Sequence, residues 1–167
     1  MIQAARILAE AAAIYDNKNA TESCSYGPEA RGSSCRAEVI ISDEAIDYPK
    51  ADKIDFLITL TQEAYNKHIA DLEAGGTVVI AQTIVTGDEL KDKILYKVPF
   101  IEIMDNQCGS EQMINIVALG IVARISNLVS KAAIRQAIMA RIPKKSEDIY
   151  LKAFEFGFAI NIEPVQH

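Results

Sequence analysis

The sequence of 167 residues contains few of the residues that build metal centres or disulfide scaffolds. It has only three cysteines and two histidines. The cysteines, Cys24, Cys35 and Cys108, are odd in number and far apart, which is typical of a reducing compartment rather than of a disulfide framework. Neither His68 nor His167 has a Cys, Asp or Glu cluster beside it at metal-ligand spacing. We therefore expect no metal site on this chain.

Long apolar runs and clusters of positive charge are also missing. No run reaches the roughly 20 apolar residues needed to cross a bilayer, and the N-terminus lacks a basic leader followed by an apolar core. The formal net charge is −6, and lysine and arginine form no stripe that could neutralise a nucleic-acid backbone. These absences argue against membrane and nucleic acid as partners, and they predict a cytoplasmic location.

The residues that are present predict an α/β fold. Half of the chain is hydrophobic, and its length suits a single domain, 1–167, with a sizeable core. Helical apolar spacing predicts helices over 1–15, 111–125, 130–141 and 146–158. Strands are predicted over 20–26, 35–42, 54–60, 77–81 and 94–98. The expected architecture has three layers: a mostly parallel or mixed central sheet covered by helices, with a helical C-terminal third.

Several finer signals accompany these elements. Ser130, Ser146 and Thr61 are each predicted to cap the helix that follows, and Gly75-Gly76 is predicted to make the turn into strand 77–81. The apolar stripe of the helix 111–125 is typical of core or of a subunit interface rather than of a cofactor wall; it comprises Met113, Ile116, Val117 and Leu119.

The least ordinary stretch is residues 25–39, where a Gly-Pro pair and a second glycine bracket an acid and an arginine ahead of an apolar strand. Arginine offers a fixed fork of donors for carboxylate or phosphate, and Gly32 and Ser33 let the backbone approach a ligand closely. Tyr26 can stack or hydrogen-bond. The alternative is a surface loop in which Glu29 pairs with an arginine. Spacing alone does not name a ligand.

The two cysteines that flank this loop allow two interpretations. Cys24 precedes it and Cys35 lies at its far end, so the pair could be redox-sensitive. The other interpretation is a pair of buried, inert thiols, which is the usual behaviour of free cysteine.

The loop and its surroundings resemble the gamma subunit of 2-oxoacid:ferredoxin oxidoreductases. The resemblance rests on Ser-Tyr-Gly-Pro-Glu-Ala-Arg-Gly at 25–32, Ile-Ser-Asp at 41–43 and Asp-Tyr-Pro at 47–49. It continues through Asn-Ile-Val-Ala-Leu-Gly at 115–120, Ile-Pro-Lys-Lys at 142–145 and Leu-Lys-Ala-Phe-Glu-Phe-Gly at 151–157. These stretches occur in the family's order and cover nearly the whole chain. The pieces at 47–49 and 143–145 look most like the 2-oxoglutarate branch, while the pyruvate and ketoisovalerate branches stay open.

The resemblance implies a reaction that joins a 2-oxoacid to coenzyme A with loss of carbon dioxide and passes the electrons to ferredoxin. Thiamine diphosphate with magnesium and iron–sulfur clusters would supply that chemistry. This chain has no Cys-x-x-Cys group for a cluster and no Gly-Asp-Gly followed by a distant Asn for thiamine diphosphate. The resemblance therefore implies thiamine-binding alpha and beta subunits and a ferredoxin-like delta subunit as partners, with no catalytic residue on this chain.

For this chain the resemblance implies help in assembly and a wall near the coenzyme A path, on a domain that can swing toward the active site. The implied coenzyme A-binding or subunit-interface residues are Ser25, Tyr26, Gly27, Glu29, Arg31, Gly32, Ser33 and Arg36, with Arg31 and Arg36 facing the phosphates. Lys144 and Lys145 could form a solvated turn or contact an acidic partner or the same phosphates.

Two departures from the family pattern accompany the resemblance. Members usually begin with a strand and a Gly-x-Gly-Gly-x-Gly turn, whereas this sequence begins inside the following helix, which predicts an N-terminally truncated domain. Ser33 stands where the family most often has glycine. The alternative function is a stand-alone nucleotide- or coenzyme A-binding module without catalytic activity, and an orphan homodimer is a third possibility.

Overall fold

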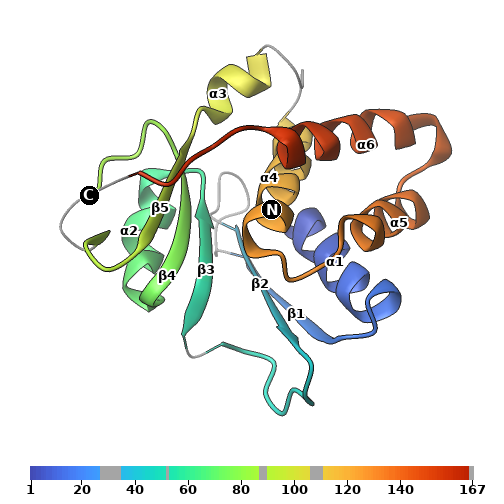
Figure 1. Cartoon of the computed structure of the whole chain (residues 1–167), viewed down its shortest axis with the longest axis horizontal. Coiled ribbons are helices and arrows are strands. Elements are labelled where there is room, and N and C mark those ends of the chain that lie inside the picture. The colour runs from blue at the N-terminus through green and yellow to red at the C-terminus, as the bar shows by residue number, and fades with distance from the viewer. Residues whose placement is uncertain (27–34, 52, 87–89, 106–110, 166–167) are drawn as a thin grey trace. The chain divides into compact units, whose positions relative to one another are not determined.

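The computed structural model describes residues 1–26, 35–51, 53–86, 90–105 and 111–165. The chain divides into two compact units, Met1–Ala51 with Gln107–Ile160, and Asp52–Asn106 with Asn161–His167. Figure 1 shows the elements of both.

The larger unit holds α1 (Ile2–Glu10), the π-helical η1 (Ala11–Tyr15), β1 (Asn19–Tyr26), β2 (Cys35–Ser42), α4 (Glu111–Ser126), α5 (Lys131–Arg141) and α6 (Lys144–Ala159). The smaller holds β3 (Ile54–Thr59), α2 (Gln62–His68), the 3-10 turn η2 (Ile69–Asp71), β4 (Leu72–Ala81), β5 (Ile94–Val98) and α3 (Phe100–Ile103). The single domain stays a prediction.

The smaller unit is organised by a parallel sheet in the order β3-β4-β5. The central strand β4 carries an unbroken apolar run, Val78, Val79 and Ile80, that is fully buried, as expected for the middle of a parallel sheet. The Thr61 side chain accepts a hydrogen bond from the Ala64 backbone N–H at 3.2 Å, so the predicted cap of α2 is confirmed.

The start of β4 differs from the prediction. Gly75 and Gly76 lie inside the strand rather than in a turn before it. Ile54 pairs with Leu72 and Phe56 with Thr77, so a step of two residues on β3 matches a step of five on β4. Gly75 has φ 77°, a conformation that side chains disfavour, which explains why glycine occupies this bulge.

The larger unit begins with α1 packed on an antiparallel hairpin. β1 and β2 pair along their whole lengths, from Asn19 opposite Ser42 to Tyr26 opposite Cys35. The first helix ends through η1 at Asp16, whose carboxylate accepts from the Ser130 backbone N–H at 2.5 Å and from the Ser130 hydroxyl at 2.7 Å. That hydroxyl also accepts from the Ala133 N–H, so the predicted cap of α5 is confirmed and is held by the end of the first helix.

Helix α4 is the core helix of this unit. Its middle is buried nearly all round, as expected for a helix that is apolar on every face; the buried residues are Met113, Ile114, Ile116, Val117, Ala118, Leu119, Ile121 and Ala123. This confirms the core interpretation of the apolar stripe. Gly120 of α4 and Gly157 of α6 lie where the two helices meet: a Cβ on Gly157 would overlap the Val117 backbone, and one on Gly120 would overlap the backbone of α6.

The predicted start of α6 was wrong. The helix begins at Lys144, with Pro143 at the N-cap and no side-chain cap, so Ser146 lies inside the first turn. Pro143 has φ −56° and ψ 137°, an extended backbone just outside the helix, and its carbonyl accepts from the Ser146 N–H at 2.8 Å. Pro143 therefore occupies the N-cap position that the sequence analysis assigned to Ser146.

A cluster of charges joins α5 to α6. Glu155 accepts from Lys131 Nζ at 2.5 Å and from Arg135 Nη1. The Lys131 ammonium also lies 4.6 Å from the centroid of the Phe158 ring. The hydrogen bond from Lys131, followed by that from Arg135, lowers the pKa of the Glu155 carboxyl below its ordinary value of 4.5.

The α/β class, the parallel sheet and the helical C-terminal third are confirmed. The predicted strands at the hairpin and at 94–98 are also confirmed. Within the described ranges, no helix is both long enough and apolar enough to cross a membrane.

We expect Gly157→Ala to destabilise the chain. In a solvent-exposed helix, alanine is more stable than glycine by about 1 kcal/mol. At Gly157, however, the added methyl group must push α4 away, at a cost of about 1–3 kcal/mol or more. Urea unfolding of the purified chain measures the change. Lys152→Ala, at an exposed position of the same helix, is the control and should change the free energy of unfolding by less than about 0.5 kcal/mol. A Gly157→Ala chain at least as stable as the wild type would contradict the close crossing.

Glu155 predicts a loss of stability in acid. Because its pKa is lowered in the folded chain, its contribution is fully present above 4.5 and disappears as the pH falls through the lower folded value. Glu155→Gln should therefore be less stable than the wild type near neutral pH, and the difference should shrink toward pH ~3. Glu147→Gln, in the same helix outside this cluster, is the control. A difference in stability between Glu155→Gln and the wild type that does not depend on pH would contradict the lowered pKa of Glu155.

Candidate functional site

The sequence-predicted site falls on the hairpin of the larger unit. Ser25 and Tyr26 end β1, and Arg36 is the second residue of β2. The other predicted residues lie outside the described part of the chain; they are Gly27, Glu29, Arg31, Gly32 and Ser33. The site can therefore be built from the ends of the two strands.

The pairing register sorts the strand residues onto two faces, because opposite residues of an antiparallel pair share a face and neighbours in sequence alternate. Ser25 lies opposite Arg36, and Ser23 lies opposite Glu38. We call the face of these four residues the arginine face. The other face, which carries Glu22 and Cys24, meets α1, and we call it the helix face.

A connected network of three side chains holds the arginine face. Glu38 forms an ion pair with Arg36 through Oε1, and its Oε2 accepts from the Ser23 hydroxyl at 3.2 Å. The side chain of Glu38 is 16% exposed and that of Arg36 is 35% exposed. The carboxylate therefore lies deeper than the guanidinium that it holds. This arrangement can present a positioned cation to an anion at the loop end of the hairpin.

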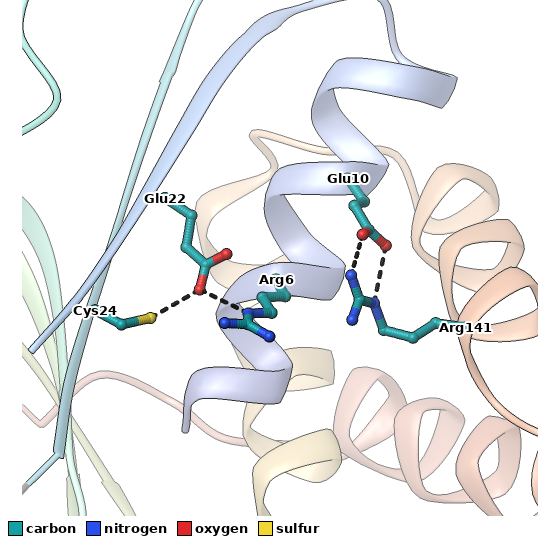
Figure 2. Close-up of polar contacts among 5 residues, drawn as sticks. All are labelled: Arg6, Glu10, Glu22, Cys24 and Arg141. Atoms are coloured by element: carbon teal, nitrogen blue, oxygen red, sulfur yellow. Dashed lines mark hydrogen bonds and ion pairs between the residues drawn. The ribbon is translucent and has the colours of Figure 1, made fainter. Parts of the chain in front are cut away.

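The helix face is held by a different set of contacts (Figure 2). Glu22 Oε1 accepts from Arg6 Nε at 3.3 Å and from the Cys24 thiol at 2.8 Å, and Glu10 forms a two-point pair with Arg141. The hydrogen bond to Glu10 raises the pKa of Arg141 above its already high value, so this guanidinium stays protonated. These pairs join α1 to β1 and to the end of α5.

The environment of Cys24 favours the inert interpretation over the redox-sensitive one. Its thiol is half-buried and donates to a carboxylate, which requires the protonated form, whereas the thiolate is the reactive form. For Cys35 only the backbone position in β2 is described.

The remaining candidates are scattered. His68 ends α2 and pairs with Asp71 at 3.5 Å, Lys144 and Lys145 are exposed at the start of α6, and His167 lies outside the described residues. Within the described chain, no three His, Cys, Asp or Glu side chains gather to hold a metal.

Sequence reasoning missed Ser23 and Glu38. The available signal was the period of two in the strand 35–42, which places residues 36 and 38 on one face. The pairing of β1 with β2 then brings in Ser23, and this register is not visible in the local sequence.

Comparison with known proteins identifies the class. The sequence model of the pyruvate ferredoxin/flavodoxin oxidoreductase family matches residues 1–160, so the chain belongs to that family. It is 43% identical to the 2-oxoglutarate synthase subunit KorC of Methanocaldococcus jannaschii, over 96% of this chain and 87% of that protein. It is 34% identical to the KorC subunit of Methanothermobacter marburgensis, over 98% and 91% of the two chains.

Solved structures agree with this assignment. The chain is similar to the gamma subunit of a keto/oxoacid ferredoxin oxidoreductase from Geobacter sulfurreducens, with TM-score 0.77 and 40% identity over 94% of this chain and 88% of that one. The 2-oxoglutarate:ferredoxin oxidoreductase of Magnetococcus marinus gives TM-score 0.82 at 19% identity, covering 95% of this chain and 28% of that chain, which shows a shared fold. The resemblance to gamma subunits of 2-oxoacid:ferredoxin oxidoreductases is therefore confirmed.

Proposed function

We propose that this chain is the gamma subunit of a cytoplasmic oxidoreductase that acts on 2-oxoglutarate. The complex oxidatively decarboxylates this 2-oxoacid, transfers the acyl group to coenzyme A and reduces ferredoxin. The observation that carries the choice of substrate is the 43% identity, over nearly the whole chain, to a subunit of a 2-oxoglutarate synthase.

In this proposal the cofactors and the chemistry belong to partner chains. Thiamine diphosphate and magnesium sit on alpha and beta subunits, and iron–sulfur clusters sit on a ferredoxin-like delta subunit. This chain lacks the closely spaced Cys-x-x-Cys group typical of ferredoxin-like clusters, which supports the assignment of the clusters to other chains. The gamma chain then assists assembly and is non-catalytic.

We further propose that the loop end of the hairpin contacts coenzyme A. Arg36 lies there on the arginine face opposite the exposed Ser25, and Arg31 follows β1 in the sequence. Coenzyme A carries phosphates, and arginine binds phosphate with paired, charge-assisted hydrogen bonds. The Magnetococcus enzyme, which shares this fold, was solved with coenzyme A and succinyl-CoA bound, and this supports the choice of ligand.

The assembly is tested by purifying the tagged chain from its native cells under anaerobic conditions. We expect thiamine-binding and iron–sulfur subunits to co-purify, with electron transfer that requires both 2-oxoglutarate and coenzyme A. Activity with pyruvate or a branched 2-oxoacid instead would overturn the substrate. Recovery of the chain alone, still binding coenzyme A, would favour the stand-alone binding module.

The coenzyme A contact is tested by Arg36→Ala and Arg31→Ala in the assembled complex. Each should raise KM for coenzyme A about tenfold, because a charge-assisted contact to phosphate is lost, and should leave KM for the 2-oxoacid unchanged. Arg6→Ala is the control, since Arg6 also pairs with a hairpin glutamate but on the helix face. A lower yield of assembled complex, with an unchanged KM for coenzyme A in the complex that does assemble, would assign the two arginines a structural role.

A further inference from the structure

Glu38 is the charged member of the arginine-face network to which neither the sequence analysis nor the proposed function assigns a role. Both of its carboxylate oxygens are engaged, Oε1 by Arg36 and Oε2 by Ser23. A carboxylate fixed at both oxygens cannot swing aside easily when a second anion arrives. It therefore stays beside the guanidinium as a permanent counter-charge.

The two side chains of this pair differ in their exposure to solvent. Glu38 is less exposed than Arg36, at 16% against 35% of the side chain, so the carboxylate lies toward the hairpin and the guanidinium lies toward solvent. The ion pair uses Nη2 of Arg36, whereas a guanidinium carries five N–H donors. A single carboxylate can therefore occupy only some of these donors.

The location of the pair within one strand also matters. Arg36 and Glu38 are two residues apart on β2, and their contact joins no other helix or strand. Partly exposed ion pairs of this kind contribute little to stability. The pair therefore has more effect on the charge and orientation of Arg36 than on the fold.

From these contacts we propose that Glu38 is a positioning residue that sets the affinity of Arg36 for a phosphate-bearing ligand. The carboxylate holds the guanidinium in a fixed orientation at the loop end of the hairpin and, through its negative charge, weakens the grip on the incoming anion. The weaker binding lets the phosphate-bearing ligand dissociate from Arg36. This inference rests on the proposed coenzyme A contact, for which it identifies the residue that adjusts binding strength.

Two substitutions separate the charge of Glu38 from its geometry. Glu38→Gln keeps an oxygen that can accept from Arg36 and an amide of the same size, but removes the negative charge. In the assembled complex it should lower KM for coenzyme A about threefold to fivefold and make that KM rise more steeply with salt, because a negative charge beside the cation is removed. The kcat and the KM for the 2-oxoacid should stay the same. Glu38→Ala removes the orientation as well, so its KM for coenzyme A should lie above that of Glu38→Gln.

The control and the double variant make the result decisive. Glu22→Gln alters the matched glutamate on the helix face, which also pairs with an arginine, and should leave KM for coenzyme A unchanged. In the Arg36→Ala background, Glu38→Gln should have no effect, because Glu38 acts through Arg36.

Three outcomes would overturn the inference while leaving the coenzyme A site intact, all in a complex in which Arg36→Ala does raise KM for coenzyme A. They are an unchanged or raised KM in Glu38→Gln, a decrease that persists without Arg36, and equal values in Glu38→Gln and Glu38→Ala. If Arg36→Ala leaves KM for coenzyme A unchanged, the proposed coenzyme A contact itself is wrong and the role of Glu38 falls with it.

Discussion

The backbone contact of α4 with α6 at Gly120 and Gly157 is the constraint on which the larger unit depends. Neither position has room for a Cβ, so the two helices meet at backbone distance. Helix α4 can be apolar on every face because α6 covers the side that would otherwise meet water. The position of α6 in turn brings Glu155 to Lys131 and Arg135 of α5, and α5 is tied to the first helix by Asp16 and Arg141. The helix that supports the hairpin is therefore fixed by contacts that begin at the two glycines.

Local sequence signals were sufficient for most elements of this fold. The apolar spacing of the helices and the β-branched runs of the strands carry their own periodicity, and the caps at Thr61 and Ser130 depend on a side chain three residues before the N–H that it binds. The errors arose where a residue has two uses. A Gly-Gly pair can make a turn or a bulge, and the choice depended on pairing with β3. A serine after proline can cap a helix or lie within it, and here Pro143 occupies the N-cap, so Ser146 lies within the first turn.

The candidate site was predictable only in part, for a related reason. The resemblance to gamma subunits selects Arg36 and Ser25 as candidate site residues, and both lie at the loop end of the hairpin. Their role in binding coenzyme A stays a prediction. Glu38 and Ser23 could not be selected from sequence, because a serine and a glutamate 15 residues apart meet only through the register of β1 with β2. The residues 27–34 carry the most specific part of the resemblance and lie outside the described structure, so their roles remain predictions.

The two faces of the hairpin use the same kind of ion pair for different purposes. On the helix face, Arg6 and Glu22 come from α1 and β1, so their contact resists separation of the helix from the strands. On the arginine face, Arg36 and Glu38 come from one strand, whose geometry already fixes their spacing. An ion pair that joins two elements stabilises their packing, whereas one within a strand mainly sets how its charges face solvent. Under the proposed function, such a pair lets a subunit act on the reaction by controlling how strongly it holds an anion that the complex must both bind and release.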